Sequence, residues 1–229
     1  MLIILPVRSR KMKKTIRLSD ATINRIPIYL RALQELNEKD WNIISSNDLA
    51  DLVGVQPAQL RKDLSYLGEF GTRGVGYDIS HLKNQLSNLI GLTEKWRIAV
   101  VGAGRLGQAL IRYQEFKKHS FDIRAVFDND PSKIGKKIEN KYILDISEIE
   151  KTVKEEGIQI GIITTPAESA QLAVKLLVEA GIKAILNFTS ASIEIPGNVQ
   201  VRHVDLSVEL QILIFKLMRE NLIKEYVNS

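Results

Sequence analysis

The chain has 229 residues, no cysteine and a formal net charge of +5 at pH 7. Its hydrophobic and charged fractions, 45% and 26%, are those of a globular protein with room for one large or two modest domains. The absence of cysteine excludes disulfides and thiolate metal sites and fits a reducing cytoplasm. Since no apolar run has the length of a transmembrane helix, we expect a cytoplasmic protein with neither a metal nor a membrane as partner. The moderately basic charge permits a nucleic-acid partner without demonstrating one.

The N-terminal segment is basic. Asp20, the first acidic residue, is preceded by Arg8, Arg10, Lys11, Lys13, Lys14 and Arg17. This distribution fits a solvated tail and a DNA-contacting arm equally well. We expect residues 1–17 to form a basic extension without ordered structure.

Residues 18–80 have the pattern of a small DNA-binding domain that starts with two helices. Apolar residues recur with helical spacing in its first part, although Pro27 predicts that the regular helix begins near that residue. Side chains of residues 45–48 are suited to cap a short helix, which Gly54 ends.

A further helix begins at Pro57, a favoured first helical position, and ends at Leu67. Its leucines are predicted to face inward, and its outward polar residues are predicted to be Gln59, Arg61, Lys62 and Asp63. Glycines at positions 68, 71, 74 and 76 then indicate a hairpin with Arg73 at its tip. Short helix, turn, basic helix and hairpin together predict a winged helix-turn-helix.

In such a domain the second helix of the helix-turn-helix, here residues 57–67, enters the major groove with its N-terminal residues near base edges. Gln59 is therefore expected to reach a base, and Arg61 and Lys62 to contact phosphate or guanine. Ser45 and Ser46 are placed to bind a phosphate oxygen.

Arg73 at the hairpin tip is expected to insert into a narrow minor groove. Taken singly, each of these charged residues fits an ordinary solvated surface. A helix pair with a basic wing in one short domain makes DNA binding the better interpretation.

Residues 81–95 are predicted to form a linker helix, and strands alternate with helices through residues 96–204. The expected order is strand 97–101, helix 105–118, strand 121–127, helix 146–156, strand 158–163, helix 167–180, strand 182–187 and strand 199–204. Such alternation predicts an α/β fold in which helices cover both faces of a parallel sheet.

The turn after the first of these strands carries a dinucleotide-binding fingerprint, G-x-G-x-x-G. Its residues are Gly102, Ala103, Gly104, Arg105, Leu106 and Gly107. The first glycine permits the tight turn, the second lets a pyrophosphate approach the backbone, and the third lets helix and strand pack closely. The helix that follows directs free N–H groups at the phosphates.

Asp128 ends the next strand, close to the offset at which an acid binds the adenosine ribose. Its carboxylate would repel a 2′-phosphate, which favours NAD(H) over NADP(H). Thr164, Thr165 and Pro166 end another strand and fit two interpretations equally well, the nicotinamide half of a pocket and a plain capped helix start. Asn187-Phe188 at the following strand end has the same ambiguity.

Residues suited to catalysis are few. His203 and Asp205 form a candidate proton-transfer pair, although such a pair at a strand end is more often structural. One alternative is therefore a small NAD-dependent oxidoreductase that uses this pair. A third interpretation is a CoA- or nucleotide-binding module with a protein-interaction domain.

The C-terminal segment, residues 205–229, is predicted to be a helix that is apolar almost all round. Between Leu206 and Met218 the polar residues are Ser207, Glu209, Gln211 and Lys216. A helix of this kind needs neighbours on several sides. Insertion into a partner subunit and burial in its own chain satisfy that need equally.

Several runs across residues 16–220 resemble the Rex family of redox-sensing transcriptional repressors. The matching runs are Arg61–Tyr66, Gly71–Tyr77, Gly102–Gly107, Phe127–Gly135, Ile185–Phe188 and Val204–Leu206. The resemblance implies a winged helix followed by a Rossmann domain, in a homodimer whose C-terminal helices are exchanged. One departure is Ser190, where many relatives carry proline.

The resemblance also implies an activity without catalysis. Members of this family bind palindromic double-stranded operator DNA when NADH is scarce. NADH closes the dimer and releases the DNA, and NAD⁺ competes weakly.

Site residues follow from the matched runs. Lys62 and Arg73 would contact DNA, with Ser65 beside them, and Asp128 would hold the adenosine ribose, with Asn129 and Lys133 nearby. A polar switch that links the nicotinamide to the DNA-binding domain would consist of Arg31, Tyr113 and Asp205 of the partner subunit.

Overall fold

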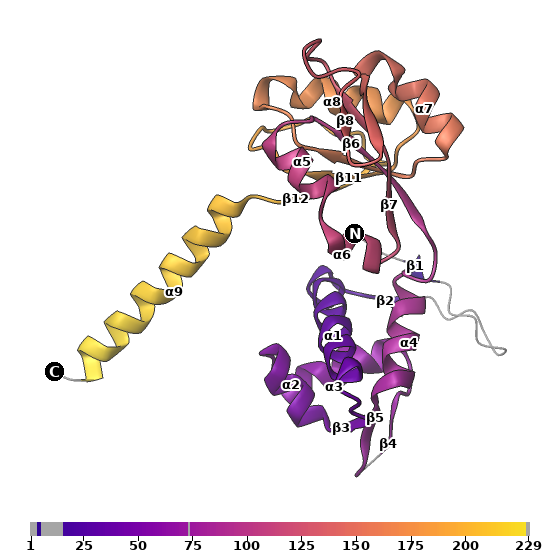
Figure 1. Ribbon diagram of the computed structural model, residues 1–229. Coiled ribbons are helices and arrows are strands. Elements are labelled where there is room, and N and C mark those ends of the chain that lie inside the picture. The colour runs from indigo at the N-terminus through magenta and orange to yellow at the C-terminus, as the bar shows by residue number, and fades with distance from the viewer. Residues whose placement is uncertain (1–3, 6–15, 73, 228–229) are drawn as a thin grey trace. The chain divides into compact units, whose positions relative to one another are not determined.

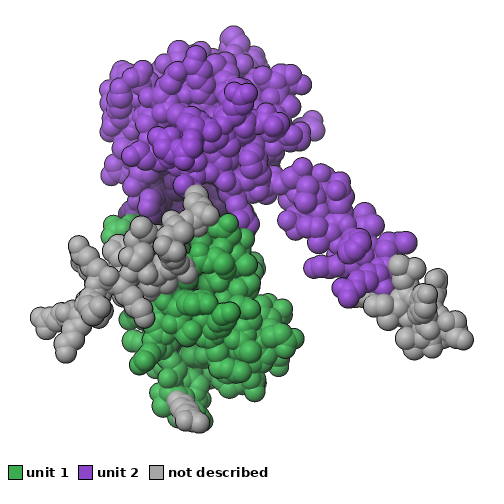
Figure 2. All heavy atoms as spheres, turned by 180° about the vertical axis from the view of Figure 1, so that it is seen from behind, with its two compact units in different colours: residues 1–94 green, residues 95–229 purple. Residues whose placement is uncertain are grey.

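The computed structural model describes residues 4–5, 16–72 and 74–227 (Figure 1). The chain divides into two compact units, residues 1–94 and residues 95–229 (Figure 2). Most of the expected extension 1–17, and the wing-tip residue Arg73, lie outside the described residues. Within the extension, β1 (Ile4–Leu5) and β2 (Ile16–Arg17) pair as short antiparallel strands.

The first helix of unit 1, α1 (Asp20–Glu38), runs without interruption through Pro27. The prediction that the regular helix begins near this proline is therefore wrong. The reason is a strong start upstream, because the hydroxyl of Ser19 caps the helix by accepting a hydrogen bond from the amide of Thr22 at 3.1 Å. Thr22 and Ile26 are buried, so tertiary packing stabilises the turns that precede the proline.

The next two helices confirm the predicted helix pair. α2 (Ser46–Val53) is capped by Ser45 and ends at Gly54, whose φ of 70° lies in the left-handed region that glycine favours. α3 (Pro57–Leu67) has the predicted bounds.

The wing is a small sheet of strand order β3-β5-β4, formed by β3 (Ile43–Ile44), β4 (Gly71–Thr72) and β5 (Gly76–Asp78). Strand β3 was not predicted, since two residues are too short to show an alternating pattern. Gly76 is required here because a Cβ would lie 2.4 Å from the carbonyl oxygen of Ile44.

Asp63 on α3 was predicted to face outward, and this prediction is wrong. Its side chain is fully buried and accepts hydrogen bonds from Thr22, Arg25 and Tyr29 of α1 and from Gln59 of α3. A carboxylate is buried in a protein when opposite charges and donors surround it, and these donors come from residues 34 to 41 positions away as well as from α3 itself.

The segment predicted as a linker, residues 81–95, contains most of α4 (Ile79–Leu89). Its side chains Ile79, Leu82 and Leu86 are fully buried in the hydrophobic core of unit 1. This helix is therefore part of the packed unit that also contains α1 and the wing.

Unit 2 contains a sheet of strand order β12-β11-β10-β6-β7-β9-β8, parallel except for β8. The strands are β6 (Trp96–Val101), β7 (Phe121–Asp128), β8 (Lys137–Ile138), β9 (Lys141–Asp145), β10 (Ile160–Ile163), β11 (Ala184–Asn187) and β12 (Gln200–His203). The order reverses at β6, whose neighbours are β10 and β7. The predicted α/β fold with a parallel sheet is confirmed.

Helices cover both faces of this sheet. Along β6, Ala99 and Val101 join one buried cluster, whereas Ile98 and Val100 join another. The first cluster includes residues of α7 (Ile149–Glu156) and α8 (Ala167–Glu179), and the second includes Ile111 of α5 (Arg105–Ile111). Strands buried on both sides explain why the sequence shows continuous apolar runs rather than alternation.

Two features of unit 2 differ from the prediction. The expected helix 105–118 is two helices, α5 and α6 (Gln114–Lys118), because the extended backbone of Tyr113 (ψ 111°) interrupts the helical hydrogen bonds. The β8–β9 hairpin was missed, and a 3-10 turn, η1 (Ile146–Glu148), precedes α7.

The last helix is α9 (Leu206–Val227), and its residues 206–218 are mostly apolar. Every side chain from residue 206 to residue 219 is exposed, with Phe215 at 72%. Among the described helices, none combines the length and apolarity needed to cross a membrane.

Stability at acid pH tests the buried carboxylate. Burial raises the pKa of Asp63, but hydrogen bonds from Arg25, Tyr29, Gln59 and Thr22 lower it more, so the net shift is downward from 3.8. Its contribution to stability is therefore present above pH 3.8 and lost as the pH falls through the folded-state pKa. We predict that Asp63→Asn lowers the free energy of unfolding at pH 7 by about 3 kcal/mol and flattens its decline in acid.

Urea unfolding at a series of pH values, followed by circular dichroism, checks this prediction. Asp51→Asn, an exposed carboxylate on α2, is the control and should behave as the wild type. Parallel pH curves for Asp63→Asn and the wild type would contradict the prediction.

Candidate functional site

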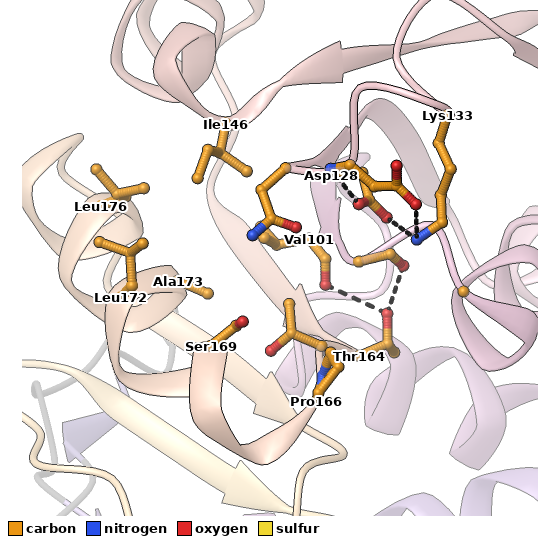
Figure 3. A pocket seen from close by; sticks show the side chains of 15 residues that line it. Val101, Asp128, Lys133, Ile146, Thr164, Pro166, Ser169, Leu172, Ala173 and Leu176 are labelled. Carbon is orange, nitrogen blue, oxygen red and sulfur yellow. Dashed lines mark hydrogen bonds and ion pairs between the residues drawn. The ribbon is translucent and has the colours of Figure 1, made fainter.

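A cavity of about 390 Å³ opens at the carboxyl ends of β6, β7 and β10, where the strand order of the sheet reverses (Figure 3). Ligands of open α/β sheets bind at this position. The predicted nucleotide-binding residues that line it are Gly102, Gly104, Asp128, Asn129, Lys133, Thr164, Thr165 and Pro166. The structure thus brings together residues from three strand ends that lie up to 64 positions apart.

The three glycines of the fingerprint meet different constraints. A Cβ on Gly107 would lie 2.0 Å from the carbonyl oxygen of Gly102, and a Cβ on Gly102 would lie 2.8 Å from the backbone of Thr164. These two glycines are required by the packing of the protein itself. Gly104 has no heavy atom within 4 Å of a Cβ and lines the cavity, so its missing side chain leaves space there for a ligand.

Asp128 joins the fingerprint turn to the end of β7. Its carboxylate accepts hydrogen bonds from the amide of Ala103 at 2.7 Å and the amide of Asp130 at 2.9 Å, and pairs with the Lys133 ammonium at 3.1 Å. Burial raises the pKa of Asp128, but these donors lower it more, so the side chain stays ionised at neutral pH. The pKa of Lys133 is raised beside it.

Two threonines at the end of β10 have different roles. The hydroxyl of Thr164 donates to the carbonyl of Gly102 at 2.7 Å and so fixes the glycine turn against β10. The hydroxyl of Thr165 is buried and has no hydrogen-bond partner within the described part of the chain. A buried polar atom without a partner is costly, so a ligand group in the cavity would satisfy it.

One wall of the cavity is apolar and was not predicted. It is formed by Ile146, Leu172, Ala173 and Leu176 (Figure 3). Three of these residues lie on α8, and the exposure of Leu172, 47% of its surface, is unusual for leucine on a helix that packs on a sheet. The leucines at i and i+4 were a sequence signal, but they could not be distinguished from ordinary core positions.

Several predicted nucleotide-binding residues do not line this cavity. Arg105 and Leu106 are exposed on the first turn of α5, and Phe188 packs beside the core. Asn187 is buried and binds Thr189 and the Nδ1 atom of His203, which lies 3.1 Å away.

The candidate catalytic pair is engaged elsewhere. The ring of His203 contacts Asn187, whereas the carboxylate of Asp205 accepts hydrogen bonds from the amide and hydroxyl of Ser207 at the start of α9. These bonds lower the pKa of Asp205. No group of three or more potential metal ligands gathers within the described residues.

A second hollow lies in unit 1, between the start of α2, the exposed face of α3 and the wing. The predicted DNA-binding residues Ser45, Ser46 and Arg61 line it together with Thr72 and Tyr77. The Arg61 guanidinium donates to the hydroxyl of Ser46 at 2.9 Å, so hydroxyl and positive charge converge at one place. Such a combination is suited to a phosphate.

The remaining predicted DNA-binding residues separate into two groups. Lys62 and Ser65 are exposed on α3, and the Ser65 hydroxyl donates to the backbone carbonyl of Lys62 at 2.8 Å. Gln59 instead donates one hydrogen bond from its amide nitrogen to Asp63 at 2.8 Å, and its contact with a base stays a prediction.

The proposed switch residues lie in both units. Arg31 is exposed on α1 and pairs with Glu35 at 3.2 Å. Tyr113 is exposed at the break between α5 and α6, where it makes an edge-on contact with Phe116. The arrangement of these residues into a switch stays a prediction.

Unit 1 is a winged helix-turn-helix, and unit 2 is a parallel sheet, covered by helices on both faces, with a cavity where nucleotides bind to such sheets. The two together are typical of regulators that bind DNA with one domain and a small ligand with the other. Family models match both units. One described as "Putative DNA-binding protein N-terminus" covers residues 17–65, and one described as "CoA binding domain" covers residues 93–191.

Relatives narrow the class. The "Redox-sensing transcriptional repressor Rex" of Desulforamulus reducens is 48% identical over 204 residues, which are 89% of this chain and 97% of the relative. That of Streptomyces coelicolor is 46% identical over 88% of this chain and 78% of the relative. The chain therefore belongs to the Rex family.

Solved structures agree. The crystal structure of RSP, a Rex-family repressor, in complex with beta-NADH matches with a TM-score of 0.84 and 37% identity, over 93% of this chain and 99% of that one. The complex of RSP with beta-NAD⁺ and operator DNA also matches with a TM-score of 0.84, at 38% identity over 94% of this chain and 99% of that one.

The two glycines Gly107 and Gly104 provide a matched pair of variants. We predict that Gly107→Ala lowers the stability of the ligand-free protein by about 1–3 kcal/mol, because the new methyl group overlaps the Gly102 carbonyl. Gly104→Ala should leave it unchanged, since its Cβ meets open space. Thermal unfolding without ligand measures both, and equal loss in the two variants would contradict this account of the turn.

Proposed function

We propose that this chain is an NADH-responsive transcriptional repressor. As a homodimer in the cytoplasm it binds palindromic operator DNA when NADH is scarce, and NADH closes the dimer and releases the DNA. The observation that carries the proposal is the cavity of unit 2, with Asp128 in register with the glycine turn, in the same chain as a winged helix. The solved structures of RSP in complex with NADH, and with NAD⁺ and operator DNA, support it.

Each part of a dinucleotide would have a partner among the residues that line the cavity. The ionised Asp128 would accept hydrogen bonds from the ribose hydroxyls, and the space beside Gly104 would admit the pyrophosphate. The amide of Ala103 already donates to Asp128, so amides farther along the turn would bind phosphate oxygens. The apolar wall around Leu172 and Leu176 suits the adenine ring, and the unpaired hydroxyl of Thr165 supplies a polar contact.

Discrimination between the redox states requires a group that senses the charge of the nicotinamide ring, which is cationic in NAD⁺ and neutral in NADH. Asp205 of the partner subunit would supply it, with Arg31 and Tyr113 as the other members of the switch. The low pKa of Asp205 keeps its carboxylate ionised at neutral pH. NADH controls DNA binding only if it binds one shape of the dimer more tightly than the other.

Exchange of α9 between subunits is supported by its surface. Between Leu206 and Met218, apolar side chains occur on all sides of this helix and are exposed in the single chain, Leu210, Leu213 and Phe215 by more than 60%. A partner subunit that surrounds the helix would remove this surface from water, at about 25 cal/mol per Å² of apolar area.

Two other functions are less well supported. CoA binding is suggested by the family model described as "CoA binding domain", but the 3′-phosphate of CoA would lie at the ribose that we propose Asp128 binds, where the carboxylate would repel it. An oxidoreductase would need His203 and Asp205 as a pair, and their hydrogen bonds go to different partners. The relatives are named repressors, and the protein is not an enzyme.

Titration of an operator complex tests the proposal. We predict that the ligand-free protein shifts operator DNA in a gel, that NADH at micromolar concentration abolishes the shift, and that NAD⁺ and CoA do so far less effectively. An operator complex indifferent to NADH would exclude the proposed function. Steady oxidation of NADH with a carbonyl substrate would favour an oxidoreductase instead.

Variants should divide the two activities. Asp128→Ala and Gly104→Ala should weaken NADH binding about tenfold or more while the ligand-free protein still binds its operator. Lys62→Ala should weaken DNA binding and reduce its salt dependence by about one phosphate contact without changing NADH affinity. Loss of both activities in any one folded variant would argue against separate sites.

The exposed helix gives a prediction on assembly. Phe215→Asp should raise the dissociation constant of the dimer about a hundredfold or more, because a carboxylate replaces an apolar contact in both subunits. Lys216→Asp, the adjacent polar position, is the control. Sedimentation velocity over a range of concentrations measures both, and an unchanged dimer in Phe215→Asp would contradict helix exchange.

A further inference from the structure

The proposed nucleotide and DNA contacts do not account for the buried carboxylate of Asp63. It accepts five hydrogen bonds, from Thr22 Oγ1 at 3.1 Å, Arg25 Nε at 2.6 Å and Nη2 at 2.9 Å, Tyr29 Oη at 2.7 Å and Gln59 Nε2 at 2.8 Å. Three of its four partner residues belong to α1, and Asp63 itself belongs to α3. The carboxylate therefore joins the helix that carries Lys62 to the first helix of the unit.

The two helices also contribute side chains to one hydrophobic core. Leu60, Leu64 and Leu67 of α3 are buried in the core of unit 1, with Leu30 and Leu33 of α1 in the same cluster. A buried ion pair adds little stability compared with apolar side chains of similar size. The ion pair instead fixes the orientation of one helix relative to the other, because each donor must point at one of two oxygen atoms. Two parallel hydrogen bonds from Arg25 also fix the plane of the carboxylate.

The orientation that Asp63 gives to α3 also determines where the exposed residues of this helix point. Neighbouring residues of a helix project about 100° apart, so the inward orientation of Asp63 sets the outward orientation of Lys62. A small rotation of α3 about its axis would change the directions in which Lys62 and Arg61 point, and with them the proposed DNA contacts. The same cluster holds the amide nitrogen of Gln59 at 2.8 Å from the Asp63 carboxylate.

We infer that Asp63 is a positioning residue for operator recognition: its carboxylate fixes the rotation of α3 against α1 so that Lys62 and Arg61 meet the DNA in one orientation. This inference rests on the proposed function. Since α1 is one helix from residue 20 to residue 38, the clamp also makes α3 move with the helix that carries Arg31, two residues beyond Tyr29.

The direction in which Asp63→Asn changes operator affinity distinguishes a positioning role from a purely electrostatic one. Removing a negative charge near DNA strengthens binding through the phosphates, so Asp63→Asn should bind any DNA more tightly if its charge alone matters. A positioning role predicts the opposite for operator DNA. Unspecific DNA requires phosphate contacts without a fixed orientation, so its affinity should change little. The ratio of operator to scrambled-DNA affinity is therefore the decisive quantity, and a mere loss of folded protein would not change it.

The experiment compares the full-length wild type with Asp63→Asn, Tyr29→Phe and Asp51→Asn, by fluorescence anisotropy on operator and scrambled duplexes and by NADH titration. We expect the affinity ratio to fall about tenfold in Asp63→Asn and about threefold in Tyr29→Phe, which loses one hydrogen bond to the carboxylate and no charge. Asp51→Asn, an exposed charge on α2, should keep the wild-type ratio. NADH affinity should be the same in all four proteins.

An unchanged or higher ratio in folded Asp63→Asn would overturn the inference. If Asp63→Asn does not fold, Tyr29→Phe decides, and a wild-type ratio in that variant overturns the inference as well. A wild type that binds its operator but is unaffected by NADH refutes the proposed function and leaves the test of Asp63 intact. A wild type that prefers no operator overturns both.

Discussion

The nucleotide cavity depends on the close approach of the glycine turn to itself and to strand β10. Gly107 lies so near the carbonyl of Gly102 that no side chain fits between them, and the Thr164 hydroxyl holds that same carbonyl from β10. Asp128 then fixes the turn from the other side through the amide of Ala103. Opposite its apolar wall the cavity is thus bounded by backbone and short hydrogen bonds, which hold the ionised carboxylate of Asp128 at its edge.

Much of this arrangement could be predicted from the sequence, because the signals were local. Ser45, Gly54 and Pro57 mark helix ends by their own backbone preferences, and the G-x-G-x-x-G turn identifies the first strand and helix of the sheet. The register of Asp128 followed from the spacing of one β-α-β unit. These predictions required no knowledge of which segments meet in space.

The errors came where tertiary contacts override local preference. The burial of Asp63 depends on Arg25 and Tyr29, which lie more than thirty positions away, and a polar residue beside Lys62 on a basic helix gives no sign of it. The uninterrupted α1 depends on packing that stabilises the turns before Pro27. The apolar wall of the cavity was missed although its sequence pattern is local, because a leucine that lines a cavity and a leucine in a core produce the same periodicity.

The exposed surface of α9 has a consequence for the life of a newly made chain. Between Leu206 and Met218, a single folded chain displays leucine, isoleucine and phenylalanine side chains to its surroundings. Chaperones and proteases recognise such surfaces, and a chain held in that state is removed. With the proposed exchange of α9, the abundance of the protein would depend on the speed of pairing as well as on the rate of synthesis. Translation of many copies from one message, where nascent chains emerge close together, would then favour survival.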